Sequence, residues 1–313
     1  MLTLGLVSFS NHLKNKILPS IANNKKIIIK ALTTKKKIIR KSYFKNKINI
    51  FNSKKKFFSK QFELIYISSE NSNHYTDIKN SISNSKKIIC EKPICTSTKK
   101  LKEIYRYAEK NKVKVFEMIQ YIHHPLFVKL QDLIKKKVIG NIKYIESSFC
   151  VPIFYDKKNF RFSSKKGGGS LYDVGYYPIS ILFTLFKLKK IKLINKTIYK
   201  KKNVDINGKI ILQDSLGRLF NLKWGLESNY ENRLNLIGSK GAIYVDFIFS
   251  KKIYQKGLIT LKKNNQVKKI SIAKSNQINN AFNEIIRSDQ KFYIYKKKLS
   301  LKILSFIERI TKY

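Results

Sequence analysis

The chain has 313 residues, a length that allows a substantial core and suits two domains better than one. Its formal net charge of +47 would fit a nucleic-acid or anionic membrane surface, but only seven of the 66 basic residues are Arg. Nucleic-acid sites favour Arg, which makes bidentate contacts. We therefore attribute the high lysine content to codon drift in an A+T-rich genome rather than to selection for a nucleic-acid surface.

The first third of the chain alternates short apolar strands with helices. Strands are expected at residues 2–8, 26–32, 48–51, 63–68, 87–90 and 113–118, with helices at 13–23, 76–83 and 97–111. Such alternation predicts a right-handed parallel sheet of the Rossmann type, which we place at residues 1–121. Ligands of these sheets bind outside the carboxyl ends of the strands.

From Pro125 onward, strands outnumber helices. Helices are expected at 126–137 and within 168–186, and strands at 142–151, 191–200, 207–213, 219–225, 233–238 and 241–247. This order predicts a second, α+β domain at residues 122–313, with an open, mostly antiparallel sheet covered on one face by the helix of Asp173. Two closing helices are expected at 279–287 and 299–311, and the Lys-rich stretches 54–56 and 200–202 read as solvated turns.

Several classes of site or location are not expected. The three Cys and four His show no metal-ligand spacing, so we expect no metal site. No signal peptide is visible before the first strand, and the longest apolar run, 178–186, is far shorter than the roughly 20 residues of a membrane span. The expectation is a cytoplasmic protein that binds neither membranes nor specific nucleic acids.

Two motifs carry the chemistry. The run Gly167–Pro178 begins with three glycines, which can hold backbone next to a bulky ligand where a Cβ would collide. It also sets Asp173 and Tyr177 four residues apart, on one face of a helix. The earlier run Cys90–Pro93 contains Lys92. A lysine, a carboxylate and a phenol that converge on one cleft form a set for proton transfer.

These motifs, in this order, resemble the Gfo/Idh/MocA family of nicotinamide-dependent oxidoreductases, which act on sugars and related polyols. The resemblance spans residues 3–248, and segments such as 65–69, 117–125, 140–142 and 238–241 share in it. Residues 147–149 and 173–178 are most similar to the branch that reduces keto groups of nucleotide-activated sugars.

The resemblance implies a site. Lys92 and Tyr177 would pass the proton that accompanies hydride transfer, and Asp173 would orient the substrate and Lys92. His124 and Gly168 would also contact the substrate. For Tyr177 the alternative is a core aromatic residue, and for His124 a turn residue. The family also implies a homodimer or homotetramer formed through the exposed face of the second sheet.

The phosphate-binding turn departs from the family pattern. Ser8, Ser10 and Leu13 stand at the three glycine positions of the expected G-x-G-x-x-G fingerprint. Two interpretations stay open, namely a more weakly bound cofactor or a chain that has lost it. The residues expected to contact the cofactor are Ser8, Phe9, Ser10, Asn11, His12, Thr34, Lys35, Ser68, Asn71, His74, Glu91 and Lys92.

The second strand is followed by Thr33-Thr34-Lys35-Lys36-Lys37, with no acid for a ribose hydroxyl. A hydroxyl and ammonium groups suit a 2′-phosphate, so NADP is the expected cofactor, with NAD as the alternative. The competing interpretation of the run is a solvated turn. Two rival functions remain, a non-catalytic sugar- or cofactor-binding relative and a basic nucleic-acid binder.

Overall fold

The computed structural model describes residues 1–36, 41–188 and 190–312. The contacts among these residues form two compact units. The first comprises Met1–Ile119 and Ile278–Glu308, and the second comprises Gln120–Gln277 and Arg309–Tyr313. The sequence expectation counted residues 278–308 with the second domain, whereas their contacts group them with the first unit.

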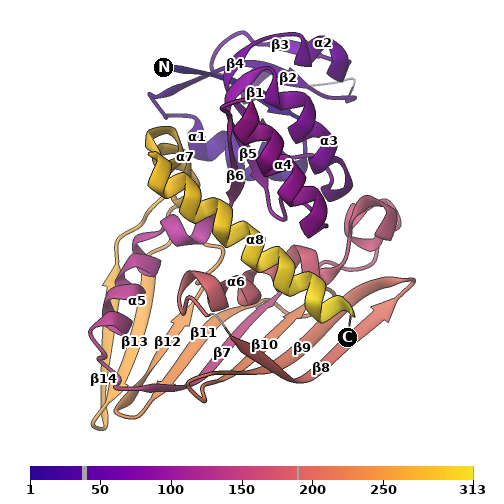
Figure 1. Ribbon diagram of the computed structural model, residues 1–313. Helices are drawn as coiled ribbons and strands as arrows, with labels where there is room; N and C mark the ends of the chain where they lie inside the picture. Colours follow the sequence, from indigo (N-terminus) through magenta and orange to yellow (C-terminus); the bar gives the residue numbers. More distant parts are fainter. Residues whose placement is uncertain (37–40, 189, 313) are drawn as a thin grey trace. The chain divides into compact units, whose positions relative to one another are not determined.

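The first unit contains a six-stranded sheet in the order β3-β2-β1-β4-β5-β6, with every neighbouring pair parallel (Figure 1). Its strands are β1 (Leu2–Val7), β2 (Ile27–Thr33), β3 (Asn49–Phe51), β4 (Phe62–Ile67), β5 (Ser85–Glu91) and β6 (Lys114–Met118). The strand order reverses direction between β1 and β4, which creates the switch point where ligands of such sheets bind. The predicted Rossmann sheet is confirmed.

Helices of this unit include η1 (Leu13–Ile17), a π-helical turn, followed by α1 (Leu18–Ile21), α3 (Asn71–Ile82) and α4 (Thr98–Lys110). The C-terminal helices α7 (Gln277–Arg287) and α8 (Gln290–Lys312) add to the same core. Ile278, Phe282 and Ile285 of α7 are buried beside Leu64 and Tyr66 of β4, and the rings of Phe282 and Tyr66 lie 5.5 Å apart. The apolar positions of α7 recur at helical spacing, so one face enters the core of the first sheet.

The second unit contains an eight-stranded sheet in the order β14-β13-β12-β11-β7-β10-β9-β8. Its strands are β7 (Ile142–Cys150), β8 (Ile191–Lys201), β9 (Val204–Asp214), β10 (Leu219–Gly225), β11 (Glu231–Gly238), β12 (Gly241–Asp246), β13 (Gly257–Lys263) and β14 (Gln266–Ile272). Only β7 and β10 pair in parallel among these strands of the described chain. The predicted mostly antiparallel sheet is confirmed.

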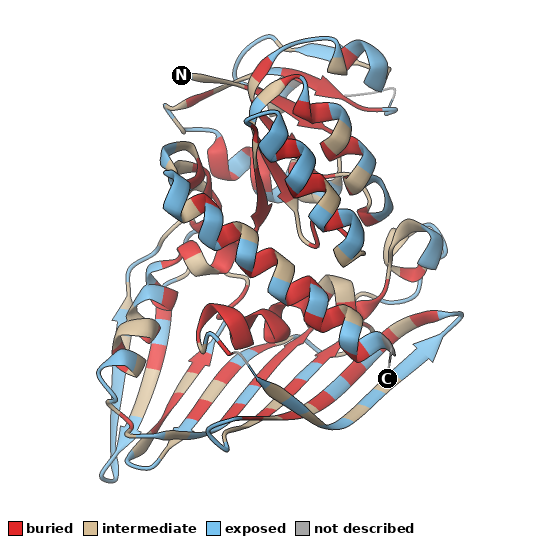
Figure 2. Ribbon diagram, viewed as in Figure 1, coloured by how far each residue is buried: buried red, intermediate tan, exposed pale blue. Residues whose placement is uncertain are grey.

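One face of this sheet is covered by α5 (Pro125–Lys135) and α6 (Tyr176–Thr184), as Figures 1 and 2 show. Every residue of α6 is buried, because it continues directly from η6 (Leu171–Gly175) along β7 and β10. Trp224 of β10 fits between two glycines: a Cβ at Gly175 would lie 2.9 Å from its ring and one at Gly208 2.4 Å. These small residues let the segment that carries Asp173 lie close against the sheet.

Several local predictions were wrong. Helix α8 begins at Gln290, nine residues before the predicted start at 299, and β8 includes Lys200 and Lys201, which were expected in a turn. Lys54–Phe58 form the short helix α2 rather than a turn, because Ser53 caps Lys56 and Phe57 is buried. Helix α3 begins at Asn71, five residues before the predicted start. Strands β13 and β14 were missed because lysines interrupt their apolar pattern, although Asn264 and Asn265 both have positive φ in the two-residue turn that joins them.

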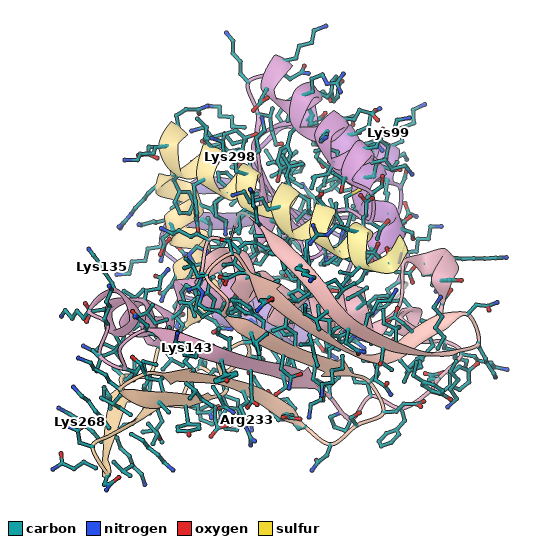
Figure 3. All side chains as sticks on the ribbon, turned by 60° about the horizontal axis from the view of Figure 1, so that its bottom comes forward. Lys99, Lys135, Lys143, Arg233, Lys268 and Lys298 are labelled. Carbon is teal, nitrogen blue, oxygen red and sulfur yellow. The ribbon has the colours of Figure 1, made fainter. Side chains whose placement is uncertain are left out.

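Lysine side chains extend from both units (Figure 3). The basic residues labelled there are all exposed: Lys99, Lys135, Lys143, Arg233, Lys268 and Lys298. They occur on helices and strands throughout the chain, as expected if lysine is used wherever the surface tolerates it. None of the helices in the described ranges has a stretch long and apolar enough to cross a membrane.

Candidate functional site

The predicted cofactor residues of the first unit gather at one edge of its sheet. Parallel strands present their carboxyl ends together, so residues that follow β1, β2, β4 and β5 share this edge. Ser8, Phe9, Ser10, Asn11 and His12 follow β1; Thr34 and Lys35 follow β2; Ser68, Asn71 and His74 follow β4; and Glu91 and Lys92 end and follow β5. This edge includes the switch point between β1 and β4.

The turn after β1 has a glycine-like backbone without glycine. Ser8 has φ +72°, in the left-handed region that glycine favours, and its carbonyl oxygen accepts a hydrogen bond from the Ser68 hydroxyl at 3.1 Å. Ser10 has no such strain; its Oγ accepts from the backbone N–H of Leu13 at 3.0 Å and so caps the start of the helical segment. The first glycine position therefore keeps its conformation at a cost, and the second has acquired a cap.

The described residues after β2, up to residue 36, form a basic turn. Thr34 is buried, and its Oγ1 accepts from the Lys36 backbone N–H at 3.1 Å. Lys35 is exposed, and the Lys36 ammonium lies 5.4 Å from the centre of the buried Phe9 ring. Lys37, the last residue of the predicted run, lies outside the described residues. Hydroxyl and ammonium groups thus flank an aromatic ring at the end of β2.

Glu91 is joined to the turn after β1. One oxygen of its carboxylate, Oε1, lies 3.2 Å from Nε2 of His12, and the same oxygen accepts a hydrogen bond from the Tyr66 hydroxyl. Burial acts to raise the pKa of Glu91, but His12, Tyr66 and Lys92 outweigh it and hold that pKa below its usual range. The phosphate turn and the residue that precedes Lys92 are therefore one connected structure.

The loop after Lys92 is held on its other side as well. His74 is fully buried; its Nδ1 lies 2.8 Å from the Pro93 carbonyl oxygen and its Nε2 2.9 Å from that of Ser69. Burial lowers the pKa of His74 although both hydrogen bonds act to raise it. Glu117 of β6 accepts from the Ile94 backbone N–H at 2.9 Å. Lys92 is thus carried by a loop that is fixed on both flanks, and its peptide bond to Pro93 is cis.

The second unit brings Asp173 and Tyr177 together on consecutive turns of η6 and α6. The Tyr177 ring is 8% exposed and packs against Phe149 and Phe249, with ring centres 5.0 and 5.6 Å away. Asp173 forms an ion pair with Arg161, whose Nε lies 2.5 Å from its Oδ2. Sequence reasoning missed Arg161 as the partner of Asp173, Tyr66 as the partner of Glu91, and Glu117 as the partner of the loop after Lys92. The residues of each pair belong to different elements, so only the fold brings them together.

The glycine run has a different structural reason from the one expected. A Cβ at Gly168 would lie 2.3 Å from the Phe160 carbonyl oxygen and 2.5 Å from that of Arg161. A Cβ at Gly169, where φ is +117°, would lie 2.2 Å from the Asp205 carboxylate. The space that these glycines leave is filled by the protein itself. The absence of a Cβ at these two residues thus has a reason within the protein, and a contact between the Gly168 backbone and substrate stays a prediction.

His124 is buried at the start of α5. Its Nδ1 accepts from the Leu126 backbone N–H at 3.0 Å, which assigns the ring proton to Nε2 in the neutral form. Burial, with a smaller contribution from Lys251, lowers the pKa of His124 to about 4. Nε2 is buried without a hydrogen-bond partner in the described part of the chain. His124 therefore caps the helix through Nδ1, as a turn residue would, and also keeps an Nε2–H donor that no described residue accepts.

Within the described ranges, no three His, Cys, Asp or Glu side chains are grouped so as to hold a metal ion. The candidate chemistry is carried by Lys92 in the first unit and by Asp173, Tyr177 and His124 in the second. An ammonium, a phenol and a carboxylate are general acid–base and hydrogen-bonding groups.

Two family models match the chain. The NAD-binding Rossmann-fold domain of the Gfo/Idh/MocA oxidoreductase family matches residues 14–119, and the C-terminal domain of the same family matches residues 127–244. Together they span β2 to β6 of the first sheet, β7 to β11 of the second sheet and both chemical motifs.

Two characterised relatives match parts of the chain at low sequence identity. A dTDP-3,4-didehydro-2,6-dideoxy-α-D-glucose 3-reductase from Saccharopolyspora spinosa is 24% identical over 204 residues, which are 64% of this chain and 61% of that protein. The NADP(+)-dependent scyllo-inositol 2-dehydrogenase IolU of Bacillus subtilis (strain 168) is 30% identical over 137 residues, 41% of this chain and 40% of that protein. The chain thus matches about two-fifths to three-fifths of the length of these two relatives.

Solved structures share the fold over nearly the whole chain. KijD10, a 3-ketoreductase from Actinomadura kijaniata in complex with NADP and TDP-benzene, superposes with a TM-score of 0.88 at 17% identity, over 98% of this chain and 95% of that one. The aldose-aldose oxidoreductase of Caulobacter crescentus superposes with a TM-score of 0.86 at 17% identity, over 99% and 96%.

Proposed function

The chain belongs to the Gfo/Idh/MocA family of oxidoreductases, and we propose that it reduces the keto group of a sugar, nucleotide-linked in its natural form, with NADPH. The observation that carries this proposal is the Lys92 loop. It stands at the carboxyl edge of the first sheet and is tied to the turn after β1 through Glu91 and His12. The 3-reductase of Saccharopolyspora spinosa and the NADP-bound 3-ketoreductase KijD10 support the choice of substrate and cofactor.

The residues of this edge fit a dinucleotide. Ser8 holds the left-handed backbone conformation of the first fingerprint glycine, so a side chain there has not removed the turn. Backbone N–H groups at the following helical segment, with the Ser10 and Asn11 side chains, would bind the pyrophosphate. Thr34 and Lys35 would bind a 2′-phosphate, while Ser68 and Asn71 would line the nicotinamide end. The buried His74 would support that end from behind, through the Pro93 and Ser69 carbonyl groups. When bound, the dinucleotide would supply the hydride.

The protein's own side chains would handle the proton. The Lys92 ammonium would donate to the carbonyl oxygen as the carbon is reduced, and the Tyr177 phenol would share that transfer. Asp173 would accept hydrogen bonds from sugar hydroxyls and so fix the sugar ring. His124 would donate its Nε2–H to a sugar oxygen, which would satisfy the buried donor that the fold leaves without a partner. One proton and one hydride added to a ketone give the alcohol.

The test of the cofactor is fluorescence titration with NADPH and NADH at physiological salt. We expect saturable binding, tighter for NADPH because of the ammonium groups after β2. The rival function, a sugar-binding relative without the cofactor, is motivated by Ser8 and Ser10 at glycine positions. It predicts no saturable binding of either dinucleotide.

The test of the chemistry is Lys92→Met, assayed with NADPH and a dTDP-linked 3-keto sugar. The substitution keeps most of the apolar stem but removes the charge and the proton. We expect turnover to fall by about 10²–10⁴-fold while NADPH affinity stays close to that of the unchanged protein. Near-normal turnover in Lys92→Met would exclude this role.

We also propose that two copies associate through the uncovered face of the second sheet. Tyr144 of β7 is 52% exposed, and its register partners Ile237 of β11 and Leu219 of β10 extend the apolar surface across three strands. An antiparallel sheet with one covered face can bury the other against a second copy. Light scattering tests this proposal by measuring the molar mass of the unchanged protein in solution. The mass of a single chain would contradict it.

A further inference from the structure

Arg161 lies in the short helical turn η4 (Phe160–Phe162) and is one of the few arginines in a chain dominated by lysine. Its Nε lies 2.5 Å from Oδ2 of Asp173, twelve residues later. The two side chains are 29% and 13% exposed, so the pair is largely withdrawn from water. A guanidinium fork orients a carboxylate in a way that the single ammonium of lysine does not.

The backbone brings Arg161 to this place. The Asn159 side chain caps the Arg161 backbone N–H at 3.1 Å, and the guanidinium lies 4.8 Å from the centre of the Phe160 ring. The Gly169 N–H donates to the Arg161 carbonyl oxygen at 2.8 Å. This approach requires Gly168 to lack a Cβ, because that atom would lie within 2.5 Å of the Phe160 and Arg161 carbonyl oxygens.

The other end of the arrangement is fixed by Asp205 of β9. Its Oδ2 accepts from the Ser170 hydroxyl at 2.5 Å and from the Leu171 backbone N–H at 2.6 Å. Asp205 thereby anchors the first turn of η6 to the sheet, and Asp173 belongs to that turn. The ion pair thus joins two segments whose backbones are each held independently.

From these contacts we infer that Arg161 is a positioning residue, which fixes the Asp173 carboxylate so that it orients the sugar but does not transfer the proton. This role rests on the proposed function, because Asp173 meets substrate only if the protein is a sugar oxidoreductase. The guanidinium donates to Oδ2 of Asp173, so this carboxylate meets the sugar as a hydrogen-bond acceptor. The glycine run contributes to the same positioning, because the absence of a Cβ at Gly168 lets η4 pack against the segment before Asp173.

The kinetic test compares Arg161→Gln, Arg161→Lys and Arg218→Gln in NADPH-dependent reduction of a dTDP-linked 3-keto sugar. Arg218 is the matched control: it pairs with Asp214 at 2.6 Å in the same unit, at the turn between β9 and β10. We expect Arg161→Gln to lower kcat by about 10- to 100-fold, since small misplacement of an orienting group has effects of that size. Arg161→Lys should recover part of the loss, and Arg218→Gln should leave kcat unchanged.

The affinity for NADPH distinguishes a local effect from general damage to the fold, because a misfolded variant would also bind NADPH more weakly. The predicted cofactor residues belong to the first unit, so Arg161→Gln should bind NADPH as the unchanged protein does. Gly168→Ala should reproduce the kinetic defect, and Arg161→Gln combined with Gly168→Ala should be no slower than the worse single variant. Equal kcat in Arg161→Gln and Arg218→Gln, or multiplying defects in the combined variant, would overturn the inference.

A urea-unfolding cycle of Arg161→Gln and Asp173→Asn decides the pairing without any activity. If Arg161 fixes Asp173, the double variant unfolds at the midpoint of the less stable single variant. Additive losses overturn the inference. If no keto sugar or dinucleotide is used by the unchanged protein, the proposed function fails, while the cycle still shows whether Arg161 holds Asp173.

Discussion

At the scale of single residues, the turn after β1 shows what a sequence can and cannot specify. The sequence has serine instead of glycine at positions 8 and 10, which predicts backbone strain or crowding of the pyrophosphate at both positions. The structure separates them: Ser8 carries a positive φ, whereas Ser10 has an ordinary backbone and caps a helix. Only the first substitution is strained, because the two glycines of the fingerprint have different backbone roles.

The two serines should therefore respond oppositely to substitution. Ser8→Gly relieves a left-handed conformation that costs a side chain about 1–2 kcal/mol, partly offset by the flexibility of glycine when unfolded. We expect a net gain of about 0.5–1 kcal/mol in the free energy of unfolding. Ser10→Ala loses the cap of Leu13 and should cost about 1 kcal/mol. Urea unfolding of both variants measures the difference; shifts of the same sign would contradict this account of the turn.

At the scale of elements, sequence pattern located almost every strand that positions the site, because buried parallel strands are continuous apolar runs. It could not locate the partners of site residues. Arg161 meets Asp173, and Glu117 meets the backbone beside Lys92, through turns whose geometry depends on tertiary contacts. The glycine run was expected to hold backbone next to a ligand, but only the structure shows that Phe160, Arg161 and Asp205 occupy the space around it.

Helix α5 gives a pH-dependent prediction. His124 caps it in the neutral form, with a pKa of about 4 against the ordinary value of 6.5. The unfolded chain therefore binds more protons between these values, so stability falls as the pH drops from 6.5 through 4. The loss from this residue should reach about 2 kcal/mol at pH 5, given about 1.4 kcal/mol per unit.

His124→Asn keeps a side-chain oxygen that can cap Leu126 but does not titrate. Urea midpoints measured at pH 7 and pH 5 should differ less in this variant than in the unchanged protein. Other groups titrate in both proteins, so the difference between the two profiles isolates His124. If the urea midpoints of both proteins changed equally between pH 7 and pH 5, protonation of His124 would not lower the free energy of unfolding.

At the scale of the whole molecule, the chain leaves the first unit at Ile119 and returns to it at Ile278. Sequence pattern found both closing helices but placed them with the preceding strands, because an amphipathic face does not reveal which core it enters. The core supplies the answer: Phe282 is fully buried beside Tyr66 of β4, in the sheet that carries the candidate cofactor residues. The first unit is therefore complete only after residues 120–277 of the second unit have been synthesised.

This return predicts which unit a distant substitution weakens. Phe282→Ala removes a buried ring from the first unit and should lower its stability by about 3–5 kcal/mol. The matched control is Phe220→Ala on β10, which removes an equally buried ring from the second unit. Hydrogen exchange read peptide by peptide should speed up in β1, β4 and β5 for Phe282→Ala, and in β7 and β10 for Phe220→Ala. Faster exchange in β7 and β10 as the main effect of Phe282→Ala would show that α7 belongs energetically to the second unit, and that the first sheet is complete without it.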